Sequence, residues 1–291
     1  MRSLFIGIIS GASIFLSSSY LGIALAQLAP QEVAQLDEEA FTLDFVLEKL
    51  NPIPVFTIAD ENGAPLVAKQ DDDSKVAGVF ISQTDANRFV EKLKINDPEI
   101  AAKVKVIPTS LGKIYKLSES AKTKAEPLKF AYIPEEEAVS SAKTIIEEQN
   151  EDSDLSDLNS DLEFESDFEK SDLEQIADLA ETIFGEKDED RSYEGGVPLF
   201  VAKIKDEEEY LTIERDRKQL TPLFFEQYQL DLAIAKLKQK KPELDDEDVE
   251  IEVLYLEALM ANLSNGEDEY PENFILIPTE ESREFIRDNK K

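Results

Sequence analysis

Two stretches of the chain carry the same succession of apolar and polar positions. Short apolar runs typical of buried strands cover residues 53–59 and 76–81, and similar runs cover residues 197–205 and 221–225. Each pair of runs is followed by an amphipathic stretch that predicts a helix, which Pro98 ends in the first case and Pro242 in the second. The apolar positions of these helices are spaced to share one face: Ala86, Phe89, Val90 and Leu93, then Leu230, Ala233, Ile234 and Leu237.

The second half of each stretch is also alike. A predicted strand at residues 104–108 corresponds to one at 249–254, with one residue inserted, and a short apolar helix follows each of them. An extended run at 128–133 or 273–277 then leads into a helix that begins with acidic residues.

The chain therefore contains an internal duplication. Laid on itself with an offset of 144, it matches without a gap at three separated places, for example Pro54-Val55-Phe56 on Pro198-Leu199-Phe200. Duplicated units usually pack about a pseudo-two-fold axis, as homodimers do. We expect an α+β protein of two lobes, each of β-meander plus helices, at residues 51–150 and 195–291.

A helical region precedes the first lobe within residues 27–50. Residues 37–50 place Phe41 and Phe45 on a wide apolar face with four further side chains, Leu43, Val46, Leu47 and Leu50. Such a face favours docking on the lobes, and a helix exposed for a partner is the alternative.

An acidic linker is expected between the lobes at residues 151–194. Residues 147–190 hold 19 Asp and Glu against Lys170 and Lys187. This composition is typical of a solvated linker over residues 150–169, with a loose Ca²⁺-binding stretch as the alternative, although the Gly and terminal Glu of an EF-hand loop are missing. Residues 171–184 predict an ordered helix, with a capping box at Ser171 and Glu174 and Gly185 at its end.

Residues 1–26 have the form of a Sec-type signal peptide. An apolar run follows Arg2, and Ala24-Leu25-Ala26 is a small-x-small cleavage site. An uncleaved anchor is the alternative. Either interpretation places the rest of the chain beyond the inner membrane, so we expect the periplasm, with the thylakoid lumen or the chloroplast intermembrane space as alternatives.

Composition narrows the chemistry that is possible. The 291 residues include no His, no Cys and no Trp, which excludes nucleophile–histidine pairs, thiolate or imidazole metal sites and disulfides. A net charge of −33 argues against nucleic acid as a partner and against an anionic membrane surface. Carboxylates could still hydrolyse glycosides, but no converging pair can be identified, so we expect neither an enzyme nor a bound cofactor or metal.

Four segments of the chain carry a family resemblance. They are residues 50–58, 63–67, 78–82 with Asp85-Ala86, and 106–115. They resemble the 22-kDa subunit family of the translocon at the inner chloroplast envelope, in its cyanobacterial form. The resemblance implies a protein-transport factor and ATP-independent holdase chaperone of the periplasm or intermembrane space, which binds unfolded or translocating proteins. A structural partner of the outer-membrane barrel assembly machinery is the alternative, and a carboxylate hydrolase a more remote one.

A passive chaperone needs apolar surface to receive unfolded segments and like charge to keep complexes dispersed. The short helices after the strands at 104–108 and 249–254 supply candidate polypeptide-binding residues: Leu111, Ile114 and Tyr115, then Leu256, Leu259 and Met260. Apolar side chains at helical spacing are more often core, and this second interpretation stays open.

Overall fold

A computed structural model describes residues 42–69, 75–122, 128–152, 196–205, 209–242, 244–245, 248–265 and 273–289. The expected signal peptide, residues 27–41 and nearly all of the acidic linker, with its expected helix at 171–184, lie outside the described residues.

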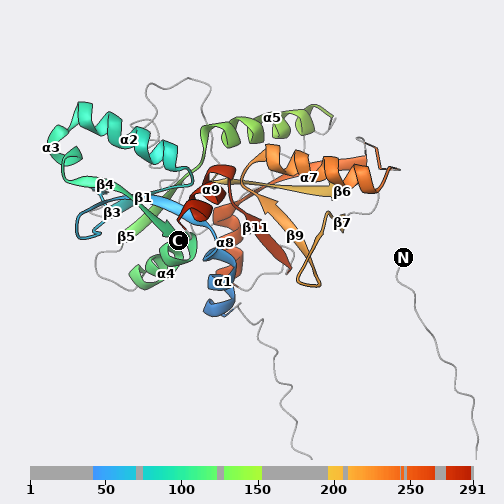
Figure 1. Cartoon of the computed structure of the whole chain (residues 1–291), viewed down its shortest axis with the longest axis horizontal. Helices are drawn as coiled ribbons and strands as arrows, with labels where there is room; N and C mark the ends of the chain where they lie inside the picture. Colours follow the sequence, from blue (N-terminus) through green and yellow to red (C-terminus); the bar gives the residue numbers. More distant parts are fainter. Residues whose placement is uncertain are drawn as a thin grey trace, which may run out of the picture. The chain divides into compact units, whose positions relative to one another are not determined.

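The first lobe, called lobe 1, is a sheet with helices attached to it (Figure 1). Its strands are β1 (Pro54–Asp60), β2 (Val67–Lys69), β3 (Lys75–Phe80), β4 (Val104–Ser110) and β5 (Leu128–Ile133). Helix α2 (Gln83–Asn96) and the single turn α3 (Pro98–Ala101) connect β3 to β4, and α4 (Leu111–Ala121) connects β4 to β5.

The second lobe, called lobe 2, repeats this order of elements. Its strands are β6 (Pro198–Ile204), β7 (Glu209–Tyr210), β8 (Ile213–Arg215), β9 (Lys218–Phe224), β10 (Val249–Tyr255) and β11 (Phe274–Ile277). Its helices α7 (Gln227–Lys240) and α8 (Leu256–Asn265) take the places of α2 and α4.

The strand registers of the two sheets confirm the duplication. Phe56 pairs with Phe80 between β1 and β3, and Phe200 pairs with Phe224 between β6 and β9. The outer antiparallel pair joins Phe56 to Pro108 in lobe 1 and Phe200 to Val253 in lobe 2, which places the inserted residue before this point of β10.

Each sheet differs in one respect from a simple meander. β5 runs parallel to β3, and β11 runs parallel to β9, whereas β4 and β10 pair antiparallel with β1 and β6. Both copies therefore have the same strand order, β5-β3-β1-β4 and β11-β9-β6-β10, which is that of an α+β fold with one parallel pair in each sheet.

Local signals set the ends of the first long helix. The sequence offers Ser82 or Thr84 as the cap of α2, and Ser82 takes this role: its Oγ accepts a hydrogen bond of 3.2 Å from the Asp85 N–H. α2 ends at Asn96, and Pro98 opens the separate turn α3 with Asp97 as its cap. The predicted apolar faces are also confirmed: Phe89 and Val90 pack on the core of lobe 1, and Leu230, Ile234 and Leu237 pack on that of lobe 2.

The two lobes exchange the helices that follow their last strands. α5 (Glu136–Asp152) follows β5 of lobe 1, yet its Ala142 and Ile145 lie in the same core cluster as Phe200 and Leu230 of lobe 2. α9 (Glu280–Asp288) follows β11 of lobe 2, yet its Phe285 packs with Phe56 of lobe 1. Each core is thus completed by the other repeat, and residues 38–291 form one compact unit.

Candidate functional site: the seam between the lobes

Equivalent hydrogen bonds place α4 and α8 in their lobes. The N–H of Leu111, the first residue of α4, donates to the Ile53 carbonyl at 2.8 Å. The N–H of Leu256, the first residue of α8, donates to the Val197 carbonyl at 2.9 Å. Both helices therefore begin beside the start of the central strand of their own sheet, and both turn an apolar side into the same region.

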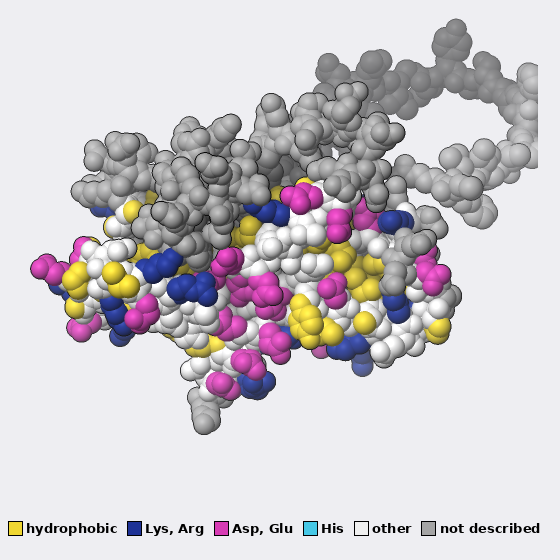
Figure 2. Space-filling view, turned by 90° about the horizontal axis from the view of Figure 1, so that it is seen from above, with side chains coloured by type: hydrophobic (Ala, Val, Ile, Leu, Met, Phe, Trp, Pro, Cys, Tyr) yellow, Lys and Arg dark blue, Asp and Glu magenta, His cyan; other side chains and the backbone are white. Residues whose placement is uncertain are grey.

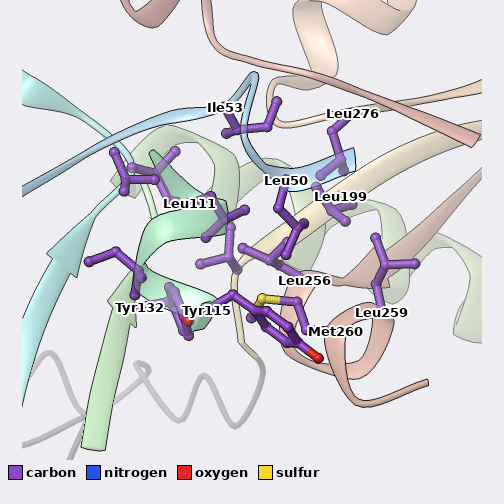
Figure 3. Packing of buried hydrophobic residues seen from close by; sticks show 14 of the residues in the cluster. Leu50, Ile53, Leu111, Tyr115, Tyr132, Leu199, Leu256, Leu259, Met260 and Leu276 are labelled. Carbon is purple, nitrogen blue, oxygen red and sulfur yellow. The ribbon is translucent and has the colours of Figure 1, made fainter. Parts of the chain in front are cut away.

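The six residues expected to bind polypeptide all lie in this region, which we call the seam. Leu111, Ile114 and Tyr115 of α4 belong to one apolar cluster with Leu256, Leu259 and Met260 of α8. Figure 3 shows side chains of both helices pointing toward one another, with Leu50 and Leu199 among them. Leu111, Leu256 and Leu259 have no exposed surface, and Tyr115, at 7%, is the most exposed of the six.

Helix α1 (Leu43–Leu50) closes one side of the seam. Val46 and Leu50 are buried in the cluster, which confirms the expected docking on the lobes, whereas Leu43 is largely exposed. Lys49 Nζ donates to the Phe274 carbonyl at 2.8 Å and lies 4.8 Å from the centre of the Phe274 ring. Burial lowers the pKa of Lys49.

A hydrogen bond between two hydroxyl side chains joins α4 to α8 across the seam. The hydroxyls of Tyr115 and Ser264 lie 2.6 Å apart, and Ser264 Oγ also donates to the Met260 carbonyl at 3.0 Å. Because Ser264 belongs to α8 and Tyr115 to α4, this pair fixes the two helices against each other within an otherwise apolar contact.

A carboxyl group is buried beside the apolar cluster. Glu257, the second residue of α8, accepts a hydrogen bond of 2.8 Å from the Val197 N–H through Oε2, while its Oε1 has no partner among the described residues. Gly196 passes so close to this carboxyl that any Cβ there would overlap it. Burial raises the pKa of Glu257 to about 7, so about half of these carboxyls carry a proton at neutral pH.

The burial of the six candidate residues agrees with their interpretation as core. In this conformation they offer a polypeptide at most a few per cent of their surface. Their role in polypeptide binding therefore stays a prediction. From the sequence we expect two separate patches, one on each lobe, whereas the structure brings the six residues into one cluster. Equivalent elements of duplicated units often meet at the interface between them, so the repeat itself could have indicated this arrangement.

A second contact between the repeats joins α9 to the first turn of α2. Glu281 Oε2 accepts hydrogen bonds from Ser82 Oγ at 2.8 Å and from the Gln83 N–H at 2.9 Å. Its Oε1 accepts from the Thr84 N–H at 3.0 Å and from Thr84 Oγ1 at 2.6 Å. The carboxylate thus satisfies free N–H groups at a helix N-terminus, where negative charge is favoured.

Several carboxyls surround this contact. Burial, together with the nearby carboxyls of Glu226, Glu281, Asp85 and Glu137, raises the pKa of Glu135 to about 8. Burial also raises the pKa of Asp85, although Arg88 lies 3.0 Å from it. At the position equivalent to Ser82 lobe 2 has Glu226, whose side chain makes no capping hydrogen bond to α7.

Apolar side chains on the described surface are dispersed. The large ones that are exposed lie on α1, α2, α3, α4 and α7: Leu43, Ile95, Ile100, Leu117, Tyr228 and Leu232. Figure 2 shows apolar side chains in separate groups among acidic and basic ones on the face seen there. Within the described parts of the chain, no helix is both long and apolar enough to span a membrane, and no group of three or more acidic side chains is placed to hold a metal ion.

The fold has counterparts among solved structures. It matches Tic22 from Anabaena, whose description includes protein transport, with a TM-score of 0.59 and 20% identity over 86% of this chain and 98% of that one. It matches Tic22 from Plasmodium falciparum with a TM-score of 0.55 and 20% identity over 83% of this chain and 95% of that one. A search of curated proteins found no match.

The sequence itself matches the Tic22-like family over residues 16–157 and 173–288, leaving out a short part of the acidic stretch. Both repeats, their exchanged helices and the seam fall within the matched ranges. The chain therefore belongs to the Tic22-like family.

Proposed function

We propose that this protein binds unfolded or translocating polypeptides without ATP, as a holdase and protein-transport factor of the periplasm. The family match over both repeats is the observation that carries the proposal, because Tic22 from Anabaena, which has the same fold, is described as a protein of protein transport. The cyanobacterial form of the family, expected from the sequence, fits a periplasmic location, and the signal-like residues 1–26 support it.

The charge of the chain supports passive binding. A net charge of −33 keeps complexes of the protein with an apolar client from associating with one another. Exposed apolar side chains such as Tyr228, at 62%, and Ile95, at 82%, offer weak contacts on both lobes. Contacts on two lobes to one unfolded chain would reinforce each other, because the second contact is intramolecular.

An aggregation assay tests this function. The chain from residue 27 onward is added to a chemically unfolded client protein that aggregates on dilution, and light scattering is followed without nucleotide. Suppression that grows with the concentration of this protein and saturates near stoichiometric amounts is expected. A variant without residues 158–172, which lie outside the family match, should suppress aggregation comparably if the matched parts bind the client.

An acidic carrier protein of similar size and charge is the control for charge alone. No suppression beyond that control would contradict the proposal. Stable co-purification with an outer-membrane assembly complex, combined with no suppression of aggregation, would instead favour the role of a structural partner.

A further inference from the structure

Helix α9 bridges the two repeats. Its N-terminus is tied to lobe 2, where the Glu280 N–H donates to Glu226 Oε2 at 2.9 Å and Gln229 Nε2 donates to the Pro278 carbonyl at 3.2 Å. The rest of the helix packs on β1 of lobe 1. α9 is therefore anchored to lobe 2 at its N-terminal end and packs on lobe 1 with the turns that follow.

The apolar side of α9 covers part of the core of lobe 1. The Phe285 ring meets the Phe56 ring edge-on, with ring centres 5.4 Å apart and an interplanar angle of 85°. Phe285 packs against the apolar cluster of lobe 1, whose buried residues are Phe56, Ile58, Phe80, Ala86 and Ile133, and α9 contacts this lobe through β1. The apolar face beneath α9 is the part of this cluster around Phe56, and removal of the helix would expose it.

The polar side of the contact is one carboxylate. Glu281 lies four residues before Phe285, and its four hydrogen bonds to Ser82, Gln83 and Thr84 hold the first turn of α9 against the first turn of α2. Positions i and i+4 share one side of a helix, so the carboxylate and the ring contact lobe 1 together. The face thus recognises an amphipathic helix with an acid in its first turn and an aromatic residue one turn later.

Two features weaken the seated position of α9. Ser282 Oγ is buried under the helix and has no partner among the described residues, which disfavours the bound state. α9 has nine residues, and a helix of that length is marginal without tertiary contacts.

The equivalent helix α5 is more firmly held. It has 17 residues, buries Ala138, Ala142 and Ile145, and its Gln149 donates to the Ile251 carbonyl of β10 at 2.9 Å.

We propose that α9 is exchangeable: it detaches from lobe 1, and the face it uncovers binds an amphipathic helical segment of an unfolded polypeptide. This inference rests on the proposed function and assigns it a specific site. Because α9 is attached to lobe 2, its effective concentration at the face on lobe 1 is high. A client segment therefore competes with α9 only when α9 is detached part of the time or when the segment binds the face more tightly than α9 does.

A cross-link tests the exchange directly. The chain has no Cys, so Thr84→Cys combined with Glu281→Cys provides two thiols at positions whose side chains meet. Joining them with a short bismaleimide holds α9 on lobe 1, whereas the single variant Glu281→Cys, capped with N-ethylmaleimide, lacks the Glu281 contact, releases α9 and keeps Ser82, Gln83 and Thr84 intact for the probe. The probe is a fluorescent peptide with the sequence of residues 278–289, and a peptide carrying Ser in place of Phe285 is its control.

The capped variant should bind the probe about tenfold more tightly than the cross-linked one, and the Ser-containing peptide should bind weakly to both. Ser282→Ala in the otherwise unchanged chain should lower the affinity for the probe, because it improves the seated position of α9. Glu284→Ala, which removes one exposed acid from α9, should leave the affinity unchanged. Thermal unfolding of each variant shows that the fold is retained.

Equal binding of the probe to the cross-linked and capped proteins would overturn the exchange of α9. If the cross-linked protein suppressed client aggregation as well as the wild type, the proposed function would stand and the exchange would fail. If the wild type did not suppress aggregation but the probe bound only after release of α9, the exchange would stand and the holdase function would fail.

Discussion

Phe56 and Phe285 belong to different repeats and meet edge-on at 5.4 Å in the core of lobe 1. Phe56 lies on the central strand β1 and has no exposed surface, while Phe285 comes from the last helix of the chain. This contact and the Glu281 hydrogen bonds mean that the first lobe is completed by the end of the sequence. The exchange of α5 for α9 therefore makes the lobes mutually dependent.

Phe285→Ala should lower the free energy of unfolding by about 2 kcal/mol, because a partly buried ring and its aromatic partner are lost. Urea denaturation followed by circular dichroism measures the change. Arg283→Ala, on the exposed side of the same helix, should change stability by less than about 0.5 kcal/mol. Equal effects of the two substitutions would show that α9 does not contribute to the core of lobe 1.

Cutting the chain between the lobes should not separate them. A protease site inserted within residues 158–172 yields two fragments, of which the first carries α5 and the second carries α9. Because each helix completes the core of the other fragment, the cut protein should elute as one species in size-exclusion chromatography and unfold in a single transition. Two independently eluting fragments under native conditions would contradict the packing of α5 on lobe 2 and of α9 on lobe 1.

Glu257 should make stability fall as the pH rises. Its pKa is about 7 in the folded protein against an ordinary value of 4.5, so between these values the folded chain retains a proton that the unfolded chain has lost. The resulting loss in the free energy of unfolding is absent below the ordinary pKa and reaches about 3 kcal/mol above neutral pH. Glu257→Gln should remove it, so the variant should gain most relative to wild type above pH 8.

Denaturant midpoints measured from pH 5 to pH 9 for both proteins test this sign. Glu135, whose pKa is about 8, also makes stability fall as the pH rises. The Glu257→Gln variant should therefore keep this dependence of stability on pH. A stability difference that does not change with pH would place the Glu257 carboxyl in water.

Replacing both Leu259 and Met260 by Asp distinguishes core from binding surface. Both side chains are buried, so two carboxylates in the seam should cost several kcal/mol, about enough to unfold the protein at 25 °C. Leu117→Asp, on an exposed position of α4, is the control and should fold normally. A folded double variant that no longer suppresses client aggregation would instead assign these residues to polypeptide binding.

The sequence determined the duplication and most of the local structure. Strand boundaries, a cap at Ser82 or Thr84 and the apolar faces of α2 and α7 follow from periodicity and capping, which act between residues a few positions apart. The offset of 144 predicted equivalent environments, and Phe56 with Phe80 repeats as Phe200 with Phe224. A strand pair in the wrong register would expose every inward side chain, so the hydrophobic pattern fixes these pairings.

Only the tertiary structure decided where the elements pack. No local pattern states that α5 covers lobe 2 or that α9 covers lobe 1, because an amphipathic helix fits any apolar face of suitable size. For the same reason the six residues of α4 and α8 could be interpreted either as surface or as core, and their burial follows from the meeting of two equivalent helices across the seam. The raised pKa of Glu257 likewise depends on that burial, a property of the assembled lobes rather than of neighbouring residues in the chain.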